Sequence, residues 1–174
     1  MLNRCALTLL IAATLPACMD GEPAVETNFD LVRFQGRWHE IARIPRDYDA
    51  DCHDTVADYR LVSLERLDLT HTCASGSAAG PQRQFRAVAT VDDPEVPSKL
   101  SLQIGLYAGS YWVLDVDDDY QHAIIGHPSR TMLWILARQP ELDAATWNNA
   151  LALVQKQGYG TSLLRETPQS AARK

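Results

Sequence analysis

Short segments in which apolar and polar residues alternate recur along most of the chain, at intervals of about ten residues. In the clearest segment, Leu100, Leu102 and Ile104 share one face, and Ser101 and Gln103 share the other. Gly, Pro and Asp residues separate the segments, as expected of hairpin turns. The pattern predicts eight strands, at approximately residues 38–43, 55–62, 67–73, 84–91, 99–106, 111–117, 121–126 and 132–138.

The period of the apolar residues changes after residue 140. Asp143 is a candidate N-cap, Gly158 stands where a C-terminal cap belongs, and an apolar stripe at helical spacing joins Trp147, Ala150, Leu151 and Val154. These features predict one amphipathic helix, which must pack on the outside of the sheet. Because hairpins connect the strands throughout, a closed up-and-down barrel is favoured over a sandwich, since closure removes the exposed edges. The predicted fold is therefore all-β: an eight-stranded antiparallel β-barrel with one C-terminal α-helix outside and room inside for one small ligand.

The first residues have the pattern of a secretory signal. Arg4 precedes an apolar run that reaches Leu15, and the chain then reads Leu-Pro-Ala-Cys to Cys18. This segment resembles a bacterial lipobox, in which the Cys thiol receives a diacylglycerol; an ordinary signal peptide with a bystander Cys is the alternative. By this resemblance Cys18 carries a lipid anchor, and Met19 after it favours the bacterial outer membrane, facing the periplasm. The predicted organisation is a signal peptide at 1–17, a flexible tether at 18–27, one domain at 28–165 and a mobile tail at 166–174.

Charge and cysteine content narrow the class of protein further. The net charge of −6 gives no electrostatic footprint for nucleic acid, so no nucleic-acid partner is expected. Cys52 and Cys73 remain once Cys5 and Cys18 are assigned to the signal and the lipid. In an oxidising envelope they are expected to form a disulfide, worth about 3 kcal/mol on the chain-entropy model, although two free thiols are the alternative.

Three motifs follow one another along the chain. They are Asn28-Phe29-Asp30 with Gly36-Arg37-Trp38-His39-Glu40-Ile41-Ala42-Arg43, then Tyr111-Trp112-Val113-Leu114 up to Asp117, and then Leu133-Trp134-Ile135-Leu136-Ala137-Arg138. With the helix that follows, they resemble the lipocalins, and most closely the branch of the bacterial outer-membrane lipocalin and apolipoprotein D, over residues 28–165. One turn departs from the family, because many members read Thr-Asp-Tyr where this chain reads Val116-Asp117-Asp118.

A barrel of this kind needs a plug at one end. Gly36 allows the turn into the first strand, and an Arg138 guanidinium stacked over the Trp38 indole would fill the space while bonding to backbone carbonyls. The resemblance implies that these residues mark the closed end and that a ligand enters at the other. The irregular loop at 45–51 is long enough to lie across that opening.

Alternation along the strands predicts which side chains face the interior. If Arg138 points inward, Trp134 and Met132 point inward with it. The same rule on the other strands gives an apolar, aromatic cavity with Tyr59 as a polar handle. The predicted ligand-binding set is Tyr59, Phe85, Leu100, Leu102, Ile104, Trp112, Leu114, Met132 and Trp134.

The resemblance implies binding of a fatty acid, a lysophospholipid or a similar amphiphile, for lipid storage, transport or membrane maintenance, without catalysis. Two alternatives stay open: an enzyme acting through Tyr59, Asp58 and His122, or a structural envelope protein whose barrel is filled. The histidines lack the spacing of metal ligands, so neither metal nor cofactor is expected. The sequence does not distinguish a monomer from a homodimer.

Overall fold

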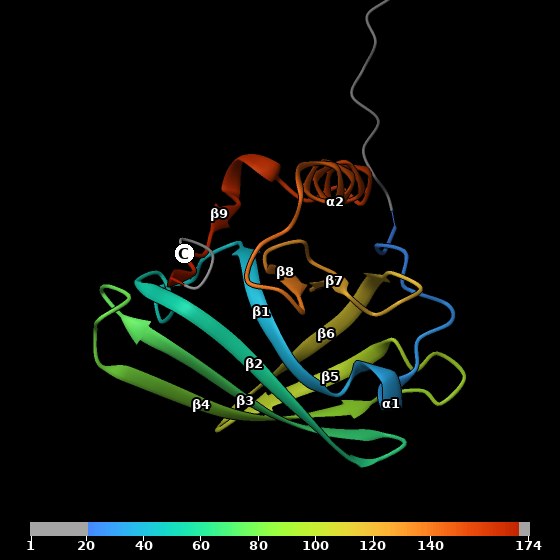
Figure 1. The fold of residues 1–174 in the computed structure, drawn as a ribbon. Helices are drawn as coiled ribbons and strands as arrows, with labels where there is room; N and C mark the ends of the chain where they lie inside the picture. The colour runs from blue at the N-terminus through green and yellow to red at the C-terminus, as the bar shows by residue number, and fades with distance from the viewer. Residues whose placement is uncertain (1–20, 171–174) are drawn as a thin grey trace, which may run out of the picture.

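The computed structural model describes residues 21–170, which form a closed antiparallel β-barrel (Figure 1). Strands β2 to β8 pair in chain order, β8 pairs with β1, and β1 pairs with β2, so the barrel has no open edge. The predicted fold class is confirmed. The elements in chain order are α1 (Leu31–Phe34), β1 (Gly36–Arg43), β2 (Cys52–Ser63), β3 (Arg66–Ser75), β4 (Gln82–Val91), β5 (Lys99–Ile104), β6 (Tyr107–Val116), β7 (His122–Gly126), β8 (Leu133–Ala137), α2 (Ala144–Lys156), the 3-10 turn η1 (Thr161–Leu163) and β9 (Arg165–Glu166).

One end of the barrel is closed by α1 and by the start of β1 (Figure 1). Gly36 has a φ of +101°, a conformation that side chains other than hydrogen rarely tolerate. Trp38 is fully buried, and the Cζ atom of Arg138 lies 3.8 Å from the centre of its ring. The Arg138 side chain also donates hydrogen bonds to five backbone carbonyls, those of Arg33, Phe34, Gln35, Arg37 and Tyr120. This geometry is that of the expected plug. The indole fills the closed end of the barrel, and the guanidinium stacked on it bonds to the surrounding backbone carbonyls.

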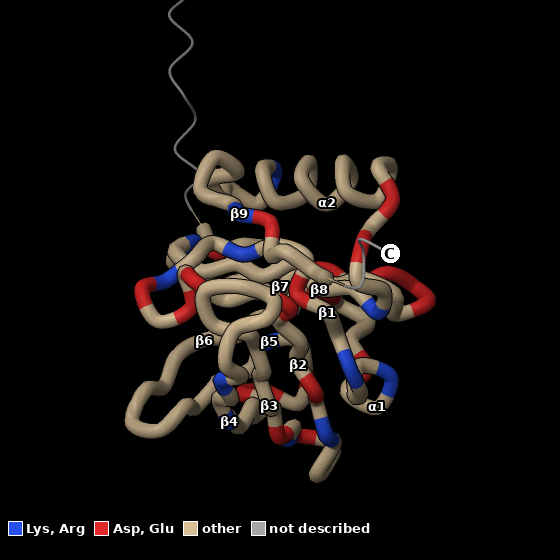
Figure 2. The backbone as a smooth tube through the Cα atoms, turned by 60° about the vertical axis from the view of Figure 1, so that its left-hand side comes forward, with Lys and Arg blue, Asp and Glu red and all other residues tan. Residues whose placement is uncertain are grey.

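Helix α2 packs on the outside of the barrel, as its single apolar stripe predicts. Ala150 and Val154 are buried in a cluster with outward side chains of β1, β7 and β8. All five residues of β8 are buried as a result, because the cavity or core covers one face and the helix covers the other. Lys156 is the one charged residue of α2, whereas acidic and basic positions are interspersed over the barrel in the view of Figure 2. Among the described residues no helix is both long and apolar enough to cross a membrane.

The ends of the domain differ from the predicted boundaries. The amide of Glu26 donates to Val113, and Lys99 pairs with Glu22, so residues 21–27 pack along the barrel and are not a free tether. At the other end, Thr167 and Gln169 are buried and bond to β1, so the predicted mobile tail is wrong for residues 166–170. Polar side chains made both segments look solvated, but their backbones pair with the barrel. The signal peptide at 1–17, the lipidation site Cys18 and the last four residues lie outside the described part of the chain.

Cys52 and Cys73 form a disulfide between β2 and β3, as the sequence predicted. Both residues are buried and lie near the ends of their strands, beside the loop that follows β1. The bond therefore fixes the start of β2, where that loop returns to the barrel.

Candidate functional site

A cavity of about 390 Å³ lies inside the barrel, toward the end away from Trp38. Its volume is in the range of about 300–1,000 Å³ that small-molecule sites usually have. One side of the cavity is apolar and aromatic. The residues of this side are Leu69, Phe85, Ala87, Leu102, Ile104, Tyr107, Tyr111, Met132 and Trp134.

Five of the predicted ligand-binding residues line this cavity. They come from β4, β5, the turn before β8, and β8, and they are Phe85, Leu102, Ile104, Met132 and Trp134. Tyr59 and Leu100 also point into the barrel, but they belong to the packed interior outside the cavity lining. These two side chains help to fill the barrel interior between the cavity and the plug.

Tyr59 does not serve the cavity as the polar handle that its position suggested. Its hydroxyl is 2.5 Å from the hydroxyl of Tyr111, so one of the two hydroxyls donates to the other inside the barrel. Burial raises the pKa of both phenols well above the usual value. Both therefore remain protonated at neutral pH, and Tyr111, which does line the cavity, presents mainly its ring.

Trp112 and Leu114 were predicted to face inward, and this prediction is wrong. They pack outside the barrel in the cluster that includes α2, while their neighbours Tyr111 and Val113 face inward. Residues 111–114 are all buried, so alternation between buried and exposed positions does not reveal the inward face. A register shift between Val113 and Asp115 then reverses the alternation, so Val116 points inward although Leu114 points outward.

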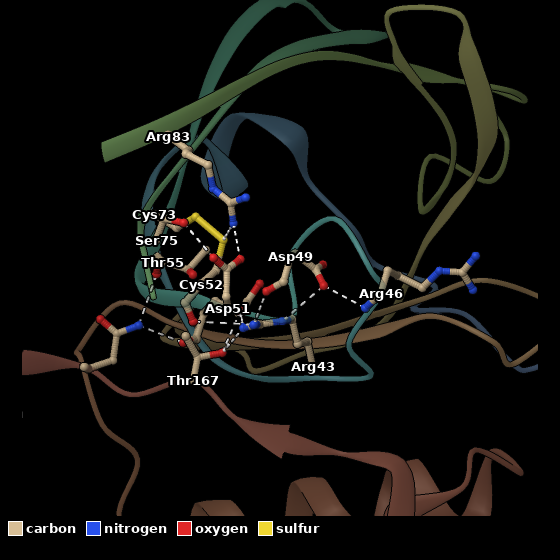
Figure 3. The surroundings of a disulfide bond; sticks show 12 residues. Arg43, Arg46, Asp49, Asp51, Cys52, Thr55, Cys73, Ser75, Arg83 and Thr167 are labelled. Atoms are coloured by element: carbon tan, nitrogen blue, oxygen red, sulfur yellow. Dashed lines mark hydrogen bonds and ion pairs between the residues drawn. A yellow bond between two sulfur atoms is a disulfide. The ribbon is translucent and has the colours of Figure 1, made fainter. Parts of the chain in front are cut away.

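The side of the cavity that the sequence did not predict is polar. Glu40 lines the cavity from β1, where it is 1% exposed, and Arg43 Nη1 donates to its Oε1 atom at 2.5 Å. Arg43 also donates to Thr167 and to the backbone carbonyl of Asp49, and its Nε lies 3.5 Å from the Asp49 carboxylate (Figure 3). Burial raises the pKa of Asp49, and the charge of Arg43 opposes that rise. The cluster ties the loop at 45–51 to the barrel wall.

Thr55 and His71 complete this polar side, on β2 and β3. Burial lowers the pKa of His71, and the nearby Glu40 and Asp49 only partly offset that effect. The imidazole is therefore neutral at pH 7. A signal for both residues was present in the sequence: Thr55 has the parity of the inward Ala57 and Tyr59, and His71 has the parity of Leu67 and Leu69.

The loop after β1 lies at the open mouth, where it was expected to lie. Arg46 and Tyr48 line the cavity there, and the Tyr48 ring is 6.4 Å from that of Phe85 in an edge-to-face arrangement. Tyr48 is 51% exposed, and Tyr107 on the facing hairpin is 49% exposed. The mouth thus has an aromatic rim and one basic side chain.

The residues considered for catalysis are not brought together. Asp58 lies on the outer surface in an ion pair with Arg37, and His122 pairs with Asp117 at 3.2 Å. Neither residue lines the cavity, and the Tyr59 hydroxyl is hydrogen-bonded to that of Tyr111. No cluster of three or more metal-ligating side chains occurs within residues 21–170.

A family model described as a lipocalin-like domain matches residues 29–169. The chain belongs to the lipocalin family. Its relatives include temperature-induced lipocalin-1 of Arabidopsis thaliana, with 33% identity over 86% of this chain and 84% of the relative. Outer membrane lipoprotein Blc of Escherichia coli K12 is 28% identical over 90% and 88%, and mouse apolipoprotein D is 25% identical over 85% and 81%. Both belong to the branch that the motifs indicated.

Among solved structures, lobster apocrustacyanin A1 matches this lipocalin with a TM-score of 0.66 at 14% identity, over 87% of this chain and 92% of that one. This similarity supports the barrel fold. Lipocalins bind small hydrophobic ligands, typically without catalysis, and the cavity described above is the place where such a ligand fits.

Proposed function

We propose that this lipocalin binds a single-chain lipid, such as a fatty acid or a lysophospholipid, in the barrel cavity. The observation that carries the proposal is the cavity of about 390 Å³, with its aromatic and aliphatic side and a mouth at one end. Eight strands leave room for one small ligand, so a barrel with such a space does not fit the alternative of a filled structural protein. Burial of an acyl chain supplies about 0.8 kcal/mol for each methylene group, less the free energy lost on association.

The proposed role is lipid storage, transport or membrane maintenance in the cell envelope, without catalysis. Two relatives support it by their names, one an outer membrane lipoprotein and one an apolipoprotein. Native mass spectrometry of protein purified from membranes tests it. A retained lipid of one acyl chain supports the proposal, whereas steady turnover of such a lipid would favour an enzyme.

Trp134→Ala is expected to weaken binding of a fluorescent fatty acid, because the indole forms part of the cavity wall. Loss of that contact should cost about 2 kcal/mol, or roughly thirtyfold in Kd. Trp112→Ala is the matched control, since Trp112 packs outside the barrel, and its Kd should stay within about twofold of wild type. Titration of both variants measures the difference. Equal losses would contradict the assignment of the cavity as the ligand site.

We further propose that a lipid on Cys18 anchors the protein to the bacterial outer membrane, facing the periplasm. The sequence around Cys18 supports this, and so does the similarity to Blc. Cys18→Ala is expected to move the protein from the membrane fraction to the soluble fraction after cell lysis. Continued membrane association of the variant would contradict the anchor.

A further inference from the structure

The polar side of the cavity is built from three adjacent strands. Glu40, Thr55 and His71 line the cavity from β1, β2 and β3, which pair in that order. Gln169 Nε2 donates to the backbone carbonyls of Glu40 and Thr55, at 2.9 and 3.1 Å, and so holds the two strands together behind the side chains. We call Glu40, Thr55 and His71 the polar wall. It faces the same cavity as Leu102, Met132 and Trp134.

Two side-chain oxygens of the polar wall, Glu40 Oε2 and Thr55 Oγ1, accept and donate no hydrogen bond among the described residues. Glu40 is 1% exposed, and its Oε1 accepts from Arg43 and from Thr167, but no described residue donates to Oε2. Thr55 is 2% exposed, and its Oγ1 has no partner in the described part of the chain. Buried polar atoms in native proteins are nearly always hydrogen-bonded, and leaving one unpaired destabilises the fold. Unpaired atoms on residues that line a cavity therefore indicate a polar group on the ligand.

The chemistry of the wall selects the kind of group. The neutral His71 ring has one donor and one acceptor nitrogen, Thr55 has a hydroxyl, and Glu40 Oε2 is an acceptor. A hydroxyl group, which both donates and accepts, satisfies such a wall. A carboxylate does not, because it would be buried next to the carboxyl group of Glu40 and near that of Asp49.

A carboxylate has a better place at the mouth. Arg46 lines the cavity there, and its guanidinium donates no hydrogen bond to any residue between 21 and 170. Figure 3 shows the Arg46 side chain extending away from the Arg43 and Asp49 cluster. Glu40 lies further in, since it pairs with Leu136 on β8, whereas Arg43 pairs with Trp134 nearer the mouth. The cavity thus has a cation at its entrance, an apolar side, and a wall for a hydroxyl group inside.

We propose that this cavity is selective for a fatty acid that carries a hydroxyl group on its chain. The hydroxyl group bonds to Glu40 Oε2 inside the barrel and, after rotation of the Thr55 side chain about χ1, to Thr55 Oγ1, while the carboxylate lies near Arg46. This inference rests on the lipid-binding function proposed above and names its ligand class. An unmodified chain would cover both oxygens without giving either a partner, so the hydroxyl group strengthens binding here, although it would weaken binding in a purely apolar cavity.

The test compares ligands that differ by one oxygen atom. Hexadecanoate, 10-hydroxyhexadecanoate and 16-hydroxyhexadecanoate each compete with a fluorescent fatty acid for the delipidated protein at pH 7.5. At least one hydroxylated acid is expected to bind about tenfold more tightly than hexadecanoate. Thr55→Val, which keeps the side-chain shape, should bring that ratio close to one, whereas Thr55→Ser should keep it. Thr72→Val on β3 is the control, because Thr72 does not line the cavity.

The possible outcomes distinguish a failure of the hydroxyl preference from a failure of the proposed lipid binding. If the fluorescent fatty acid does not bind, or if it binds and none of the three acids displaces it, lipid binding in the cavity is contradicted. If all three bind but neither hydroxylated acid binds more tightly than hexadecanoate, the hydroxyl preference is wrong and lipid binding stands. If the preference exists in wild type but persists in both Thr55→Val and Glu40→Gln, the polar wall is not its source, and the proposed site is overturned.

Discussion

Arg43→Met is expected to lower the free energy of unfolding by about 3–5 kcal/mol, because it leaves buried acidic groups without their cation. Arg43 is 4% exposed and pairs with Glu40 at 2.5 Å and with Asp49 at 3.5 Å. Its guanidinium also bonds to Thr167 near the C-terminus. The Arg43 side chain therefore links β1, the loop at 45–51 and the C-terminal segment. Denaturant titration of the variant measures the loss.

The loss should depend on pH. Burial already raises the pKa of Asp49, and Arg43 lowers it, so the variant raises that pKa further. A carboxyl group whose pKa is raised in the folded state binds more protons folded than unfolded, so the stability of the variant falls as pH rises through that pKa. The deficit relative to wild type is therefore expected to be smaller at pH 5 than at pH 8.

Arg37→Met is the matched control on the same strand. Its ion pair with Asp58 is solvent-exposed, with side chains 63% and 40% accessible, so its loss should cost about 0–1 kcal/mol. Equal losses for Arg37→Met and Arg43→Met would show that the buried cluster does not carry the stability assigned to it.

Trp38→Ala is expected to destabilise the fold by about 3–5 kcal/mol, because it empties the closed end of the barrel. Trp38 is fully buried against Phe34, with ring centres 4.9 Å apart, and against the Arg138 guanidinium. Its indole nitrogen also donates to the Phe34 carbonyl at 2.8 Å. Trp38→Phe keeps the stacked ring and should lose less. Thermal or denaturant unfolding ranks the variants.

Lipid affinity should respond differently from stability in this series. Trp38 does not line the cavity, so the folded fraction of Trp38→Ala should bind a fatty acid with a Kd within about threefold of wild type. Trp134→Ala, in contrast, should lose affinity. If Trp38→Ala weakened binding as much as Trp134→Ala, the plug would be part of the ligand site, against the division of the barrel into two ends.

The sequence predicted which side chains face the barrel interior on strands where one residue of known direction set the alternation. Strand β8 is buried along its whole length, yet Arg138 just beyond it placed Met132 and Trp134 inside correctly. No such residue marks β6. Its run from Tyr111 to Leu114 is buried on both faces because α2 and the segment at 21–27 pack on the outside, so a period-two rule had no polar position from which to start.

The polar wall shows a different limit. Glu40, Thr55 and His71 have the parity of inward neighbours, but a polar residue on a strand normally faces water. Whether such a residue is buried depends on which other segments of the chain pack over it. Here Arg43 on the same strand, together with Thr167 and Gln169 from the distant C-terminal segment, supplies partners that make an inward Glu40 tolerable.

The sequence by itself determined the barrel, the outer helix and the plug, because alternation, capping residues and a Trp with a distant Arg act through local geometry and one contact. Tertiary structure alone decided which face of β6 meets the cavity and that the cavity has a polar side. Both depend on burial by segments far apart in the chain, namely α2 and residues 21–27 over β6–β8 and the C-terminal residues over β1. The feature that specifies the ligand is therefore the one that only the closed barrel assembles.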